Sequence, residues 1–143
     1  MNLTEVLAVA FEDVNWLGVV VAALSTFIVG SAWYHDKTLG PRWMKAVGLK
    51  RKDLENANML RTFGLSLILS LLSAIVLSVF AVIIGVDNAF DGGLLGGVVG
   101  TFFVVTSTGS NYLFAQRSFD LFAIDASYMI VNFVGMGAII GAL

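Results

Sequence analysis

The sequence contains no cysteine and only one histidine, and both shortages exclude kinds of site. Without cysteine there is no disulfide, no thiolate-bound metal and no cysteine nucleophile. With His35 as the sole imidazole, a metal centre of several histidines cannot form within one chain. Among the remaining residues no nucleophile–base pattern and no dinucleotide-binding motif appears. We therefore expect neither enzymatic activity nor a bound cofactor.

Charged residues are also scarce, at 13% of the chain, against about 25% in ordinary soluble domains. The hydrophobic fraction is 58%, which is more apolar surface than a domain of 143 residues can enclose. We therefore expect one integral membrane domain over residues 1–143. The N-terminal segment carries Glu5, Glu12 and Asp13 but no basic residue, so the first apolar run is a retained span and not a secretory signal.

What the chain does have is a series of long apolar runs. Crossing the hydrocarbon core takes about 20 apolar residues as a helix. Short connections make sequential helices antiparallel neighbours. The glycines of the third and fourth runs are typical of helices that pack closely. We predict an all-α fold, an antiparallel bundle of four transmembrane helices at about residues 15–34, 63–86, 94–114 and 121–143.

Positive charge is confined to the connections on one side of this bundle. Seven of the eight Lys and Arg residues lie between Trp33 and Arg61, and the eighth, Arg117, lies in the turn between the third and fourth runs. Basic connections stay in the cytoplasm, so we expect both termini to lie outside. The membrane would be the cytoplasmic (inner) membrane of a bacterium.

The basic segment also contains a signal for a short helix. Gly40-Pro41 can open a helix, because proline is tolerated at its first position. Basic residues next to apolar ones predict that this helix lies on the anionic inner leaflet. Because lipid explains the charge, we expect no nucleic-acid partner. The expected leaflet contacts are Lys37, Arg42, Trp43, Lys45, Lys50, Arg51 and Lys52.

Asp125 is the only ionisable side chain inside a predicted span. A carboxylate there costs a few kcal/mol on insertion scales, so it should face protein, a partner or water. Counting residues from the turn near Ser118 places Asn111 and Tyr112 at the level of Asp125 on the facing helix. We predict a polar intramembrane cluster of Asp125, Asn111, Tyr112, Tyr128, Asn132, Arg117, Trp33 and Tyr34.

Two roles for Asp125 remain open from the sequence. In one, Asn111 or Arg117 binds the carboxylate and the pair locks the last two helices together. In the other, Asp125 responds to a proton or cation, or anchors a polar head group. In the third run, we expect the buried side to be the face shared by Gly97, Thr101, Val104, Thr108 and Asn111.

Short motifs over nearly the whole chain resemble those of one family of small bacterial membrane proteins. The motifs are N-W at 15–16, G-x-x-W-Y at 30–34, G-x-x-W-M-K-x-x-G-L at 40–49, I-D-x-x-Y at 124–128 and M-G-A-I-I-G at 136–141. The family is a domain of unknown function, the one numbered seventeen sixty-one. The resemblance implies a four-span architecture, and it implies no reaction and no catalytic residue.

Three functions fit the sequence. The first is an accessory or structural subunit that packs against itself or a larger membrane complex through small-residue faces. The alternative is a homo-oligomeric transporter or channel for a small ion or solute, with Asp125 in a polar path between subunits. An enzyme acting on lipids is the third, and the shortage of histidine and cysteine counts against it.

Overall fold

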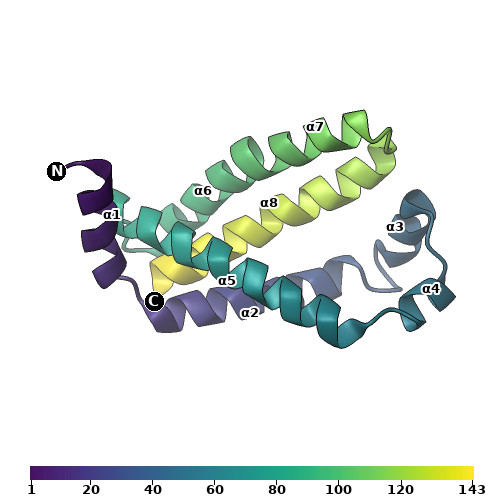
Figure 1. Ribbon diagram of the computed structural model, residues 1–143, viewed down its shortest axis with the longest axis horizontal. Helices are drawn as coiled ribbons and strands as arrows, with labels where there is room; N and C mark the ends of the chain where they lie inside the picture. The colour runs from purple at the N-terminus through teal and green to yellow at the C-terminus, as the bar shows by residue number, and fades with distance from the viewer.

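The computed structural model describes residues 1–143 and consists of helices and their connections (Figure 1). Four helical stretches are long and apolar enough to cross a membrane: α2 (Trp16–Trp33), α5 (Met59–Ile84), the stretch Ala89–Phe114 and α8 (Phe119–Ala142). The prediction of an all-helical chain with four such helices is confirmed.

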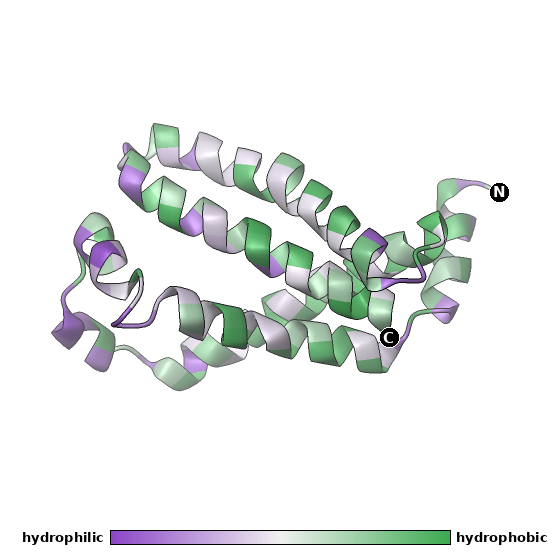
Figure 2. Ribbon diagram, turned by 180° about the vertical axis from the view of Figure 1, so that it is seen from behind, coloured by the Kyte–Doolittle hydropathy of each residue, from purple (hydrophilic) through white to green (hydrophobic).

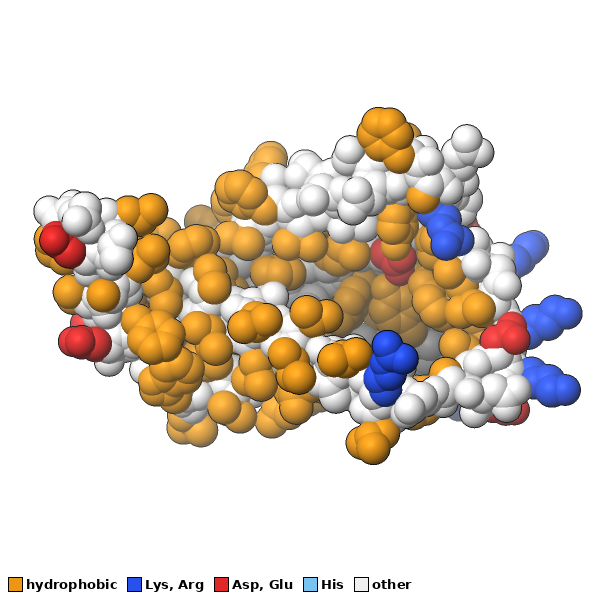
Figure 3. All heavy atoms as spheres, viewed as in Figure 1, with side chains coloured by type: hydrophobic (Ala, Val, Ile, Leu, Met, Phe, Trp, Pro, Cys, Tyr) orange, Lys and Arg blue, Asp and Glu red, His pale blue; other side chains and the backbone are white.

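Three short helices lie at the two ends of the bundle. At one end is α1 (Leu3–Glu12), whose first turn is closed by a capping box between Asn2 and Glu5. At the opposite end lie α3 (Gly40–Val47), α4 (Arg51–Glu55) and the turn between α7 (Thr106–Phe114) and α8 (Figure 1). This opposite end holds all eight Lys and Arg residues, and we call it the basic end. Figure 3 shows their side chains gathered there.

The third membrane-length helix begins at Ala89, earlier than the expected residue 94. The side chain of Asn88 caps it by accepting a bond from the backbone N–H of Asp91, at 2.9 Å. Gly92 and Gly93, which follow in the first turns, are therefore helical residues. They are used for packing against α8.

Contact between α6 (Ala89–Val99) and α8 is so close that backbone meets backbone. A Cβ added to Gly92 would overlap the carbonyl oxygen of Gly137, and one added to Gly96 would overlap that of Phe133. The predicted role of these glycines in close helix packing is confirmed. In this pair the buried row is Gly92, Gly96 and Gly100, whereas Asn111 of the expected row is exposed.

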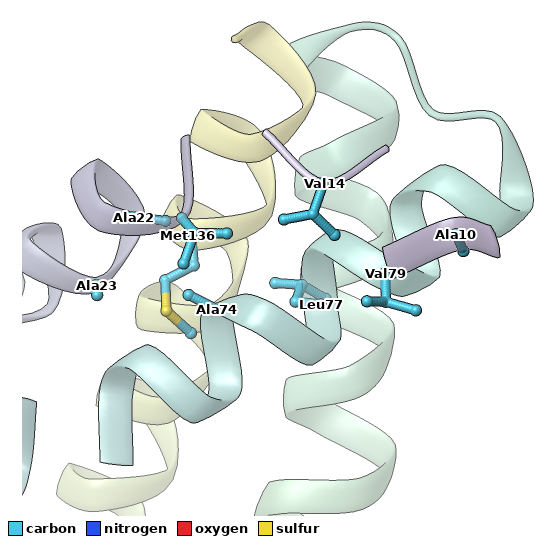
Figure 4. Packing of buried hydrophobic residues seen from close by; sticks show 9 residues of the cluster. Ala10, Val14, Ala22, Ala23, Ala74, Leu77, Val79 and Met136 are labelled. Carbon is cyan, nitrogen blue, oxygen red and sulfur yellow. The ribbon is translucent and has the colours of Figure 1, made fainter. Parts of the chain in front are cut away.

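The hydrophobic core lies toward the end that carries α1. Small and medium side chains of α1, α2, α5 and α8 meet there (Figure 4). Their small volume allows the helices to approach closely. The core consists of Ala10, Val14, Val19, Ala22, Ala23, Ala74, Leu77, Val79 and Met136.

Toward the basic end the bundle opens. The pair α7 and α8 diverges from α2 and α5, as Figures 1 and 2 show from opposite sides. Figure 3 shows a hollow between these pairs on the face it presents. The only direct side-chain bond between α2 and α5 joins the hydroxyls of Thr26 and Ser70, at 3.1 Å. The predicted polar cluster lies in this open half.

The third membrane-length helix is interrupted by a π-helical segment. Between α6 and α7 (Thr106–Phe114), the residues Gly100–Val105 form the π-helix η1. In a π-helix the backbone bonds reach back five residues instead of four, so one extra residue is accommodated. The faces of α7 are therefore rotated relative to those of α6.

Candidate functional site

Asp125 of α8 is buried and held by two tyrosines. Tyr34, directly after α2, donates its hydroxyl to Oδ1 at 2.7 Å, and Tyr112 of α7 donates its hydroxyl to Oδ2 at 2.6 Å. Only 7% of Asp125 is exposed. We call these three residues the tyrosine clamp. The clamp links three of the four membrane-length helices.

Further aromatic groups support the clamp. Trp33 donates its indole N–H to the carbonyl oxygen of Ile124, at 3.2 Å, which fixes the end of α2 to α8 directly before Asp125. The ring of Tyr34 lies edge-on to those of Trp43 and Tyr128, with centroids 5.6 and 5.2 Å apart. Edge-to-face pairs of this kind are favourable beyond their buried area. The Tyr34 hydroxyl is thereby held toward Asp125.

No basic side chain forms an ion pair with Asp125. The two salt bridges join Arg42 to Asp120 and Arg51 to Asp36, all at the surface of the basic end. The guanidinium of Arg51 lowers the pKa of Asp36 by hydrogen bonding and by its charge. An ionised carboxylate offers about four acceptor positions, and the clamp uses one on each oxygen. About two acceptor positions of the Asp125 carboxylate therefore have no partner within the chain.

The π-helix explains why Tyr112, and not Asn111, reaches Asp125. In a continuous α-helix each residue turns the face by about 100°, so Asn111 would lie about 20° from the Gly100 face that contacts α8, and Tyr112 about 120° away. One inserted residue turns α7 back by about 100°, which brings Tyr112 to about 20°. Asn111 is accordingly exposed. The expectation that Asn111 binds Asp125 is wrong for this reason.

Arg117 does not bind Asp125 either. It is exposed, forms no ion pair, and lines a cavity of about 220 Å³ together with Tyr112 and Phe122. The two sequence-based candidates for locking Asp125 are thus both replaced by tyrosines.

Tyr128 and Asn132 continue the Asp125 face deeper into the bundle. The Tyr128 hydroxyl lies 3.5 Å from the carbonyl oxygen of Thr26, and Gly30 leaves room for its ring. Asn132 is buried, and its Oδ1 has no hydrogen-bond partner in the chain. A buried amide oxygen of this kind costs free energy unless water or an ion binds it. Asn132 therefore extends the polar region without contacting the clamp.

The residues expected at the inner leaflet lie at the basic end. Lys37, Arg42, Lys45, Lys50, Arg51 and Lys52 are exposed, and two of them, Arg42 and Arg51, are engaged in the salt bridges. Trp43 is half-buried against Tyr34 instead of being free. A cavity of about 330 Å³ between α3, α4 and the start of α5 is lined by Tyr34, Trp43, Arg51 and Met59, among others.

Sequence reasoning missed two features of the site. The contact of the Tyr128 hydroxyl with Thr26 left no signal, because its acceptor is a backbone carbonyl oxygen, which every residue has. The π-helix left no signal, because the hydropathy of Gly100–Val105 is the same in an α-helix and in a π-helix.

Comparison with known proteins gives a family without a described function. No curated protein and no solved structure matches the chain. The match extends over residues 17–141, which include all four membrane-length helices and every residue of the tyrosine clamp. The chain therefore belongs to the family described as "Protein of unknown function (DUF1761)".

Proposed function

We propose that this protein is an integral membrane protein without catalysis of its own, which acts as an accessory or structural subunit by packing against itself or a larger membrane complex. The observation that carries this proposal is the outward face of α7. Ser107, Ser110 and Asn111 are exposed on it, and none of their side chains has a hydrogen-bond partner in the chain.

The position of these groups makes lipid a poor neighbour for them. They lie within the stretch Ala89–Phe114, about 5 to 10 Å from its end when counted at 1.5 Å per residue. Hydrocarbon offers no hydrogen bonds, so unpaired polar groups at such depth are covered by protein or line water. A partner that packs on α7 satisfies them.

The same proposal includes an orientation. Cytoplasmic connections carry the excess of Lys and Arg, so the basic end would face the cytoplasm and both termini the outside of a bacterial inner membrane. The exposed lysines around α3 and α4 would then contact the anionic leaflet.

Purification from the native membrane tests the subunit role. We expect the tagged protein, extracted in mild detergent or in native nanodiscs, to be recovered as a stable assembly with further copies or with another membrane protein. Recovery as a monomer in both conditions would contradict a role through packing. Identifying the co-purified chains by mass spectrometry separates self-assembly from a larger complex.

A second function, a homo-oligomeric transporter or channel for a small ion, is favoured by one observation. The buried carboxylate of Asp125 receives hydrogen bonds only from neutral phenols. A carboxylate inside a membrane costs free energy, and such residues often mark the path of an ion. We expect liposomes holding the pure protein to show an ion flux that is lost on Asp125→Asn. Asp120→Asn, which alters a surface carboxylate of the same helix, is the control. If no ion flux depends on Asp125, the protein is not a transporter or channel that uses this carboxylate.

A further inference from the structure

The outward face of α7 is the strongest feature of the molecule that its own contacts leave unused. Three of its residues, Ser107, Ser110 and Phe114, follow one another at spacings of three and four, and Phe103 of η1 lies four residues before Ser107. This is the spacing of helices that pack side by side with interlocking side chains. Asn111 lies beside Ser107, one turn further along. We call these five residues the α7 seam.

The seam is exposed along its whole length. Phe103 is 69% exposed and Phe114 is 88% exposed, and the three polar residues between them are exposed as well. In Figures 1 and 2, α7 lies at the edge of the molecule with α8 as its neighbour. No helix of the same chain covers the seam.

The seam is built like a contact between helices in a membrane. The serines at its centre are small enough for two backbones to approach closely, and their hydroxyls bond across the contact. The two phenylalanines at its ends are large enough to fill grooves on a neighbouring helix. Lipid alone would suit Phe103 and Phe114 but not the amide of Asn111.

The chemistry of the seam specifies its partner. Each hydroxyl and the amide can both donate and accept a hydrogen bond, and no charge is present. Such a surface is complementary to a copy of itself across a two-fold axis, where each donor meets an acceptor. All copies insert in the same orientation, so the axis lies along the membrane normal and the two α7 helices run parallel. A charged or purely apolar partner would leave the amide unpaired.

We propose that a second copy of this chain docks on the α7 seam, Ser107, Ser110 and Asn111 forming the polar centre of a parallel, two-fold contact. The inference rests on the proposed subunit function and names its partner. In this arrangement two faces of α7 form contacts. One presents Tyr112 to Asp125, and the other, about half a turn away, meets the second copy.

Because the chain has no cysteine, single-cysteine variants test the contact directly. Ser110→Cys places a thiol near the axis, and Leu65→Cys, on the exposed face of α5 at a similar distance from the basic end, is the matched control. Membranes are oxidised, and the products are separated by size under non-reducing conditions. We expect the Ser110→Cys variant to form a disulfide-linked dimer and the Leu65→Cys variant to stay monomeric.

A second measurement follows the strength of the contact. In liposomes, dimer formation is measured by single-molecule photobleaching over a range of protein-to-lipid ratios. Loss of one membrane hydrogen bond costs about 0.6–1.7 kcal/mol, and the two-fold symmetry removes the bond twice, so Asn111→Ala should weaken association about eight- to three-hundredfold. The exposed position of Asn111 allows this change without altering the fold.

Each other outcome contradicts a defined part of the proposal. Equal crosslinking of both variants would mean random collision, and the seam would fail as a specific contact. Crosslinking of Ser110→Cys to a different protein would refute the second copy and leave the subunit function standing. Monomers throughout, in the native membrane as in liposomes, would overturn the seam and the subunit function together.

Discussion

At the scale of single residues, the tyrosine clamp explains how a carboxylate is kept inside an apolar bundle without a base. Each oxygen of Asp125 receives one short bond from a phenol. Hydrogen bonds to an ionised acceptor are stronger than those between neutral groups. Tyrosine supplies such a donor on an aromatic ring that is itself compatible with the membrane. The clamp links the three helices it joins and uses one acceptor position on each oxygen of the carboxylate.

The contribution of each tyrosine is measurable. We expect Tyr34→Phe and Tyr112→Phe each to lower the free energy of unfolding by about 0.6–1.7 kcal/mol, the range found for hydrogen bonds between membrane helices. Neither change should matter in an Asp125→Leu background, because the acceptor is gone. Reversible unfolding in mixed micelles by titration with denaturing detergent gives both values.

The control for this cycle is Leu113→Ala on α7. Leu113 is 81% exposed and borders the clamp residue Tyr112 in sequence. An equal loss of stability for Leu113→Ala and Tyr112→Phe would show that the hydroxyl of Tyr112 contributes nothing specific.

At the scale of elements, the sequence predicts which segments form helices and fails where a helix changes its pitch. The four spans are predictable because apolar length alone decides them. Position along the helix was also predictable, since Asn111 and Tyr112 do lie near the level of Asp125. Rotation was not, because the η1 segment changes the angular relation between α6 and α7 without changing hydropathy. This shift of one residue is why Tyr112, and not Asn111, contacts Asp125.

Removing one residue from η1 tests this account. Deleting Phe102, which is 66% exposed, should convert η1 to α-helix and turn α7 by about 100°. In the shortened chain, Tyr112→Phe should no longer affect the free energy of unfolding, whereas Asn111→Leu should reduce it. Detergent unfolding of the shortened chain and of its two substituted forms measures both effects. Unchanged sensitivity to Tyr112→Phe would mean that the register does not depend on η1.

The pairing of α6 with α8 gives a second prediction for an element. Gly96→Ala should destabilise the protein by about 1–3 kcal/mol or more, because its Cβ would overlap the carbonyl of Phe133 and neither backbone can yield. Gly135→Ala on α8 is the control, since nothing lies within 4 Å of an added Cβ there. Thermal unfolding of the purified variants in detergent compares them. If both variants unfold alike, backbone contact between α6 and α8 is not what stabilises this pair.

At the scale of the whole molecule, packing and charge are distributed unevenly along the bundle. The core and the glycine contacts lie toward the end with α1, and the clamp, the hollow and all the basic residues lie toward the other. The tightly packed half holds the helices together. In the open half fewer contacts constrain the helices, so helix positions can change there with the least loss of packing.

The side of the membrane that this open half faces decides which solution lies nearer to Asp125. Counting from Phe119, Asp125 lies about 9 Å from the start of α8 at the basic end. Because Lys and Arg stay in the cytoplasm, we expect an alkaline phosphatase fused after Leu143 to be active and one fused after Leu49 to be inactive. Green fluorescent protein at the same two positions should give the reverse pattern. Phosphatase activity after Leu49 would place the basic end outside, and any proton bound by Asp125 would then come from the external solution instead of the cytoplasm.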